Sequence, residues 1–148
     1  MTGDQENPGQ RDPASEESLA EAFTAVARRL REVSAESLAP WDITPAHWRA
    51  LRVLNRHGTM RLSELSDHLR IAPRSATEVV DALEQRGLVQ RRPDPGDRRA
   101  TLAGLTGPGS NLLDAVRAAR GTAAQRFFGQ LSPADRAHLA RILGQLRG

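Results

Sequence analysis

Residues 62–105 read LSELSDHLRIAPRSATEVVDALEQRGLVQRRPDPGDRRATLAGL, and their pattern of apolar and turn residues is enough to predict the fold. Leu65 and Leu69 lie four residues apart, which is the spacing of the buried side of a short helix. Pro73 suits the first position of a second helix, because the N–H that proline lacks would have no partner there. The pattern predicts that this second helix runs to Arg86.

The second helix has two chemically different sides. Its apolar residues recur at helical spacing and predict a buried side; they are Ala76, Val79, Val80 and Leu83. The opposite side is polar and begins with Arg74, Ser75 and Thr77. The sequence therefore predicts one side packed on a core and one side open to solvent.

A β-hairpin is predicted directly after this helix. Residues 88–92 and 100–105 have strand patterns, and residues 93–97 (PDPGD) form a dense turn signal. Five arginines against two aspartates leave a charge of +3 within residues 86–99. These arginines are Arg86, Arg91, Arg92, Arg98 and Arg99.

Two short helices followed by a basic hairpin predict a winged helix-turn-helix in a mainly α (α+β) chain. A helix fits the major groove of DNA, and short polar side chains near its N-terminus reach base edges. A hairpin beyond it can place a guanidinium in the minor groove. The alternative is a solvated hairpin on a helical domain that binds nothing in particular.

Three segments in this order resemble the MarR-type transcriptional regulators. They are residues 62–69 (LSELSDHL), residues 79–89 (VVDALEQRGLV), and residues 97–99 (DRR) followed by Leu105-Thr106. The resemblance covers roughly residues 43–113, and compatible helices on both sides extend it to nearly all of the chain that is expected to be ordered.

The resemblance implies a DNA-binding homodimer with a winged helix-turn-helix in each subunit. It implies that Arg99 enters the minor groove with Arg98 beside it, and that Asp97 helps to fix the wing. The base readers that it implies are Arg74, Ser75 and Thr77. It also implies a dimer interface built by the first helix and the last two helices, and an inverted-repeat operator of double-stranded DNA.

Four departures from the family pattern carry expectations of their own. The resemblance makes the helix at residues 73–86 the recognition helix, which enters the major groove. Ala72 has no side-chain oxygen to cap this helix, and Glu78 stands where a basic residue is common in the family. Residues 103–104 (AG) replace a usual valine, which predicts a weaker or more mobile wing. Residues 107–109 (GPG) are expected to delay or loosen the start of the next helix.

The flanks of the chain predict the remaining organisation. Residues 1–17 carry a charge of −4 and almost no apolar side chain, so they are expected to be a disordered acidic tail. Residues 18–148 are expected to form one domain, with dimerisation helices at 18–39 and 107–148 and the winged helix-turn-helix at 44–106. The apolar stripes of the first and last helices are expected to pack largely across a two-fold axis.

Thr44 is predicted to cap a helix that begins at Pro45, and a small-molecule site is expected around the start of this helix. Trp41, His47, Trp48 and Arg52 gather in the region that lines the ligand cavity of MarR-type dimers. The resemblance implies a small aromatic or phenolic ligand that relieves repression. The alternative is that Trp48 belongs to the core and that Trp41 anchors the loop.

The composition and the absence of certain motifs argue against several other classes of function. The 148 residues contain no cysteine, and all 21 basic residues are arginine, so thiolate metal sites and thiol chemistry are excluded. The four histidines have no metal-ligand spacing, and no nucleophile–base pair or phosphate loop is present, so we expect no metal, no cofactor and no enzymatic activity.

No apolar run approaches the length of a membrane span, and the N-terminus has no signal-peptide pattern. We therefore expect a cytoplasmic regulator that does not contact the membrane. The competing function is a winged-helix module that binds another protein and not DNA. Such a module has no need for Arg98 and Arg99 at the hairpin tip.

Overall fold

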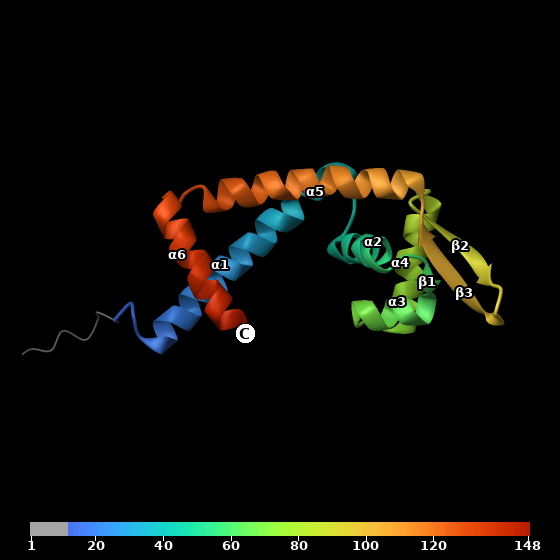
Figure 1. The fold of residues 1–148 in the computed structure, drawn as a ribbon, viewed down its shortest axis with the longest axis horizontal. Coiled ribbons are helices and arrows are strands. Elements are labelled where there is room, and N and C mark those ends of the chain that lie inside the picture. Colours follow the sequence, from blue (N-terminus) through green and yellow to red (C-terminus); the bar gives the residue numbers. More distant parts are fainter. Residues whose placement is uncertain (1–11) are drawn as a thin grey trace, which may run out of the picture.

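The computed structural model describes residues 12–148. Within these residues, the long helix α5 spans the molecule, with a compact lobe under one end and two crossing helices, α1 and α6, at the other (Figure 1). The elements in chain order are α1 Glu16–Glu36, the 3-10 turn η1 Ala39–Trp41, α2 Pro45–His57, β1 Met60–Arg61, α3 Leu62–Leu69, α4 Pro73–Gln85, β2 Val89–Asp94, β3 Asp97–Leu105, α5 Gly107–Phe128 and α6 Pro133–Arg147. The mainly α fold with a winged helix-turn-helix is confirmed.

The hydrophobic core lies inside the lobe. Leu51 of α2, Leu65 of α3 and Leu83 of α4 are fully buried, and Leu113 of α5 closes the core from above. The predicted buried side of α4 is confirmed in full, because Ala76, Val79, Val80 and Leu83 all lie in the interior. Packing therefore determines which side of α4 is exposed to solvent.

The hairpin is part of a three-stranded antiparallel sheet in the order β1-β3-β2. Both long strands extend further than predicted, and only Pro95 and Gly96 form the turn between them. Asp94 explains the extension, since its carboxylate accepts hydrogen bonds from the Gly96 N–H at 2.9 Å and from Arg61 Nε at 2.8 Å. These bonds keep the end of β2 attached to the sheet.

The unusual pair at residues 103–104 has a packing explanation. Ala103 is fully buried and pairs with Met60 of β1. A Cβ added to Gly104 would lie 2.6 Å from Thr59 Oγ1, which is closer than real Cβ atoms come. Small residues here allow the segment before α3 to approach the wing, and they need not imply a looser hairpin.

The expected delay in the start of α5 is wrong. This helix begins at Gly107, and the Thr106 hydroxyl accepts a hydrogen bond from the Gly109 N–H at 3.1 Å. A Cβ on Gly109 would lie 2.1 Å from the carbonyl oxygen of Leu88. The glycine is therefore needed for close approach to the strand end, and Pro108 occupies the first turn, where it suits a helix.

The N-terminal boundaries also differ from the predicted ones. Helix α1 begins at Glu16 with Ser15 as its cap, so Glu16 and Glu17 are helical and do not belong to a tail. Carboxylates in the first turn favour this start through the helix dipole. The helix ends at Glu36, before the predicted Ala39, and Ala39–Trp41 form the separate turn η1 with Pro40 as its second residue. Residues 1–11 of the expected tail lie outside the described residues.

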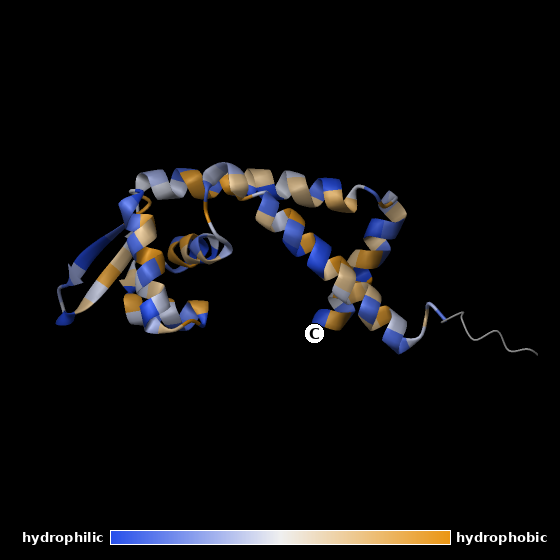
Figure 2. Cartoon of the chain, turned by 180° about the vertical axis from the view of Figure 1, so that it is seen from behind, coloured by the Kyte–Doolittle hydropathy of each residue, from blue (hydrophilic) through white to orange (hydrophobic). Residues whose placement is uncertain are grey.

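Helices α1 and α6 differ from the lobe in having exposed apolar side chains. Over their described lengths neither helix has a buried residue. Apolar segments are visible along both helices where they cross (Figure 2). The exposed fractions are Leu19 57%, Phe23 58%, Val26 52%, Ile142 43% and Leu146 75%. Phe23 and the C-terminal half of α6 border a cavity of about 640 Å³.

Candidate nucleic-acid interface

The first turn of α4 has a polar side that is exposed to solvent. Pro73 occupies the first position of the helix, and Ala72 at the cap position makes no side-chain hydrogen bond, as the sequence predicted. The Arg74 side chain is 92% exposed, with Nε 3.6 Å from Glu78 Oε1. Exposed ion pairs of this kind contribute little stability, so Arg74 is free to exchange Glu78 for another acceptor.

The two other predicted base readers lie on the same exposed turn. Ser75 is exposed and Thr77 is exposed. The Thr77 hydroxyl donates to the carbonyl oxygen of Pro73 at 3.1 Å, so its own proton is already used within the helix. In this geometry Thr77 offers an incoming base an acceptor oxygen and a methyl group.

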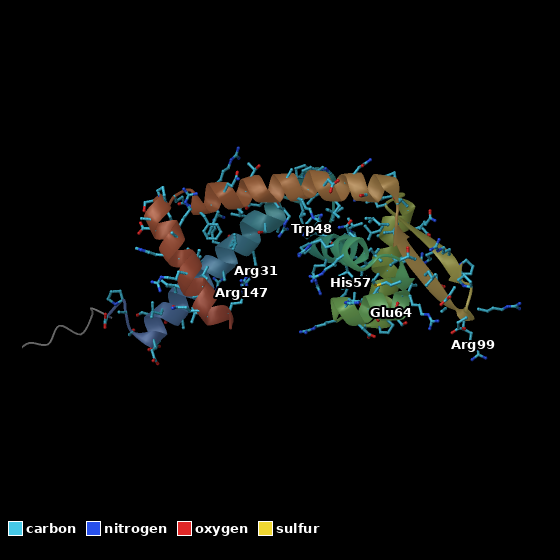
Figure 3. All side chains as sticks on the ribbon, viewed as in Figure 1. Arg31, Trp48, His57, Glu64, Arg99 and Arg147 are labelled. Carbon is cyan, nitrogen blue, oxygen red and sulfur yellow. The ribbon has the colours of Figure 1, made fainter. Side chains whose placement is uncertain are left out.

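The wing places its arginines at its tip. Arg98 and Arg99 are both exposed at the start of β3, and Arg99 points away from the lobe (Figure 3). The Arg99 N–H donates to Asp97 Oδ1 at 3.0 Å. This contact is the kind of restraint that was expected of Asp97, since it fixes the backbone from which the Arg99 side chain extends.

A brace between the wing and the recognition helix was missed by sequence reasoning. The Arg91 N–H donates to Glu84 Oε2 at 2.7 Å, and Arg91 Nη1 lies 3.1 Å from Glu84 Oε1. Arg91 Nη2 pairs with Asp81 and donates to the carbonyl oxygen of Thr77 at 3.4 Å. One side chain of β2 therefore contacts three successive turns of α4.

The electrostatics of the brace agree with its geometry. Hydrogen bonds from the Arg91 backbone and side chain lower the pKa of Glu84. Burial works against the charge of Arg91, but hydrogen bonds to Asp81 and Glu84 raise the pKa of Arg91 overall. Both shifts favour the charged forms of Glu84 and Arg91.

The contacts of Arg91 reduce the number of hairpin arginines that are free to meet a ligand. Arg91 is neutralised by α4, and Arg86 donates to the backbone carbonyl oxygens of Trp41 at 2.6 Å and Asp42 at 2.8 Å. Arg92, Arg98 and Arg99 remain exposed on the wing. No sequence signal predicts this division, because which side of β2 faces α4 depends on the tertiary packing.

The predicted ligand residues form two separate groups. In the first, Trp48 is buried and its Nε1 has no hydrogen-bond partner among the described residues. The Arg120 guanidinium lies 5.4 Å from the centre of the Trp48 ring. Burial and the nearby charge of Arg52 lower the pKa of Arg120. This group therefore combines the aromatic ring of Trp48 with the guanidinium groups of Arg52 and Arg120.

The second group is structural. The Thr44 hydroxyl accepts from the His47 N–H at 3.1 Å, and His47 Nδ1 accepts from the Thr44 N–H at 3.4 Å, which forms a capping box for α2. Burial and the charge of Arg86 lower the pKa of His47, and Asp42 opposes this. Trp41 is half-buried against the core, as the packing alternative expected.

Several classes of site are absent from the part of the chain that the structure describes. Among residues 12–148, no group of three or more His, Cys, Asp or Glu side chains could hold a metal ion. No helix in this range has the length and apolar character needed to cross a membrane.

An exposed recognition helix beside a braced basic wing defines a winged helix-turn-helix DNA-binding protein. Comparison with known proteins agrees with this class. The model of the MarR family matches residues 43–101. The HTH-type transcriptional repressor IacR of Pseudomonas putida is 30% identical over 137 residues, which are 89% of this chain and 82% of the relative.

Two solved structures are similar over nearly the whole chain. The crystal structure of RV1404 from Mycobacterium tuberculosis superposes with a TM-score of 0.79 and 32% identity, covering 95% of this chain and 97% of the other. A mutant of MarR from E. coli complexed with operator DNA gives a TM-score of 0.68 and 26% identity, covering 86% and 92%. The chain belongs to the MarR family and is a DNA-binding transcriptional regulator.

Proposed function

We propose that this regulator is a dimeric repressor that binds an inverted-repeat operator in the cytoplasm and is released by a small aromatic or phenolic ligand. The observation that carries the DNA-binding mode is the brace from Arg91 to α4, because it holds the exposed wing in a fixed relation to the exposed first turn of α4. A module for protein binding would not need a basic wing braced in this way.

The two DNA-contacting elements have different roles. Arg74 is placed to bind guanine N7 and O6 in the major groove, with Ser75 and Thr77 beside it. Arg99 is placed to enter the minor groove, where it reads groove width and negative potential more than base identity. Arg98 contacts the adjacent backbone, and Asp97 orients the wing turn through the Arg99 N–H.

The dimer is supported by the exposed apolar side chains of α1 and α6. We propose that residues 18–39 and 107–148 form the dimerisation part and residues 44–106 the DNA-binding part. A second copy related by a two-fold axis would cover both apolar stripes at once. The two recognition helices would then meet major grooves about one helical turn, roughly 10 bp, apart.

The ligand site is proposed at Trp48 and Arg52, extended by Arg120. An aromatic acid would stack on the indole and place its carboxylate between the two guanidinium groups. The unpaired Trp48 Nε1 would gain an acceptor. His47 and Trp41 flank this region through the α2 cap and the preceding loop. Such a ligand releases DNA only if it binds one position of the lobes better than the other.

Protection mapping on the DNA that flanks the gene tests the proposal, because it gives the operator and the half-site spacing together. Arg74→Ala should cost about 1–3 kcal/mol of operator affinity and relax the preference at one base position. Arg99→Ala should weaken binding to all sequences and lower the salt slope by about one unit per lost phosphate contact. Asp97→Ala should add little to Arg99→Ala.

An Arg99→Ala variant with unchanged operator affinity and salt slope would refute the assignment of the wing, whatever Arg74→Ala does. The ligand is tested separately by tryptophan quenching with a panel of aromatic acids and phenols. Absence of both quenching and DNA release across that panel would refute the effector site but leave the DNA-binding assignment intact.

A further inference from the structure

A cavity of about 460 Å³ lies on the side of the lobe formed by α2, the end of α3 and α5. Val53, Asn55 and Leu69 form part of its wall. The ionisable side chains that line it are Arg49, Arg52, Arg56, Arg117, His57 and His68. Of the described residues that line this cavity, none is acidic.

Helical spacing explains how so many cations meet in one place. Arg49, Arg52 and Arg56 recur at three and four residues on α2, so they share one side of that helix. Arg117 faces them from α5. The Arg49 guanidinium donates to the carbonyl oxygen of Leu69, which fixes it against the end of α3.

Two imidazole rings complete the cavity. His57 at the end of α2 and His68 of α3 are stacked, with ring centres 4.4 Å apart and planes 27° apart. Imidazole N–H groups are hydrogen-bond donors in either charge state. The cavity therefore combines guanidinium and imidazole donors from three helices.

The arginines of this cavity differ from the two that are partly buried beside the sheet. Arg61 and Arg91, which are partly buried beside the sheet, each pair with at least one carboxylate. By contrast, Arg52, Arg56 and Arg117 form no ion pair with any residue in the range 12–148. Guanidinium groups held around one cavity repel one another, and a bound anion would remove that repulsion.

We propose that this cavity, defined by Arg49, Arg56, His68 and Arg117, is a binding site for a small polyanion with at least two phosphate or carboxylate groups. One anionic group would bind between Arg117 and α2, and another would accept hydrogen bonds from Arg56 and the imidazole pair. Arginine and carboxylate or phosphate form strong, charge-assisted bidentate contacts. The binding claim does not depend on the proposed repressor function.

The position of the cavity favours a small ligand over the DNA backbone. His57 lies on the side of the lobe that faces α1 and α6, whereas Arg99 extends from the opposite side (Figure 3). Arg117 belongs to α5, which covers the lobe away from the first turn of α4. A small anion can contact Arg117 and α2 together, and a duplex on the recognition helix and wing lies elsewhere.

Calorimetric titration of the 148-residue chain tests the proposal. Pyrophosphate and citrate are the probes, and acetate is the monoanion used for comparison at matched ionic strength. At least one polyanion should bind with a Kd below about 1 mM, and acetate should not. Arg56→Gln and Arg117→Gln should each weaken that binding about tenfold. The control is Arg141→Gln, which removes an exposed arginine of α6 away from the cavity and should change nothing. Circular dichroism melts of each variant establish that it is folded.

Three outcomes would overturn the proposal. In the first, neither polyanion binds the wild-type protein. In the second, Arg141→Gln weakens binding as much as Arg56→Gln, which would indicate diffuse attraction to a basic surface. In the third, no anion binding depends on the cavity arginines, but Arg56→Gln and Arg117→Gln each lower the salt slope of operator binding by about one. The cavity would then contact the DNA backbone. Loss of operator binding in Arg99→Ala concerns the other proposal and leaves this one unchanged.

Discussion

The lobe and the pair α1 and α6 both contain apolar side chains at helical spacing but use them in different ways. In the lobe, leucines such as Leu51 and Leu83 are fully buried within one chain. In α1 and α6, Phe23 and Leu146 are 58% and 75% exposed. The lobe therefore buries a core of its own, whereas the other two helices need a second surface to cover their apolar stripes.

The largest expected effect is a difference in the free energy of unfolding between matched truncations in the two regions. Leu51→Ala should lower the free energy of unfolding by about 2–5 kcal/mol, because it leaves a cavity in a closed core. The matched truncation Leu146→Ala should change the free energy of unfolding of the lobe far less. Its effect should come from weaker association of the subunits. Chemical denaturation monitored by tryptophan fluorescence, repeated at several protein concentrations, measures both. Equal concentration-independent losses for the two variants would contradict the contrast.

The next effect breaks the association directly. Phe23→Asp places a charge in the apolar stripe of α1, so the dimer should dissociate at micromolar concentration while the lobe stays folded. Operator affinity should fall a hundredfold or more, or about 2.8 kcal/mol, since a monomer contacts one half-site. Sedimentation equilibrium and fluorescence anisotropy are the measurements. Thr24→Asp, exposed and turned away from the apolar stripe of α1 by helical spacing, is the control. Dimers of Phe23→Asp at that concentration would show that α1 is not at the interface.

A smaller effect concerns the brace inside the lobe. Arg91→Gln removes the contacts to Asp81 and Glu84, so the wing should lose its fixed position and operator affinity should fall about tenfold. The neighbouring exposed substitution Gln90→Ala is the control. A double-mutant cycle of Arg91→Gln with Arg99→Ala measures the coupling. Strict additivity in that cycle would mean that Arg91 stabilises the fold without positioning Arg99.

The smallest effect is a pH dependence at the α2 cap. The pKa of His47 is lowered in the folded protein, so the unfolded state binds more protons as the pH falls below about 6.5. The wild type should therefore lose stability between pH 7.5 and 5.5, because protonation also removes the acceptor for the Thr44 N–H. His47→Gln should show a flatter profile over the same range. Parallel profiles in thermal melts would indicate that this bond does not respond to pH.

Residues close together in the chain were the ones that could be predicted. The buried side of α4 and the capping of α2 by Thr44 are confirmed, because helix periodicity and capping depend on neighbours within four residues. The exposed positions of Arg74 and Arg99 follow from the same patterns. Their contacts with DNA remain predictions.

Two features that differ from the sequence prediction depend on segments that are distant in sequence. Residues 107–109 were expected to loosen a helix start, yet Gly109 is required by the carbonyl oxygen of Leu88. Arg91 was counted as a free charge of the wing, yet it binds α4. The ligand site around Trp41, His47, Trp48 and Arg52 stays a prediction, to which the structure adds the contact of Trp48 with Arg120 and the capping of α2 by His47.

The order of the helices, the winged helix-turn-helix and the family could be inferred from the sequence, because periodicity, caps and turn residues are local properties of the chain. The division between paired and unpaired charges depends on how distant segments pack. It pairs Arg91 and Arg61 with acids across the lobe and leaves the arginines around the α2–α5 cavity without such partners in the described chain. The physical reason is that an ion pair needs two side chains within about 4 Å. Sequence spacing does not give that distance for residues on different elements.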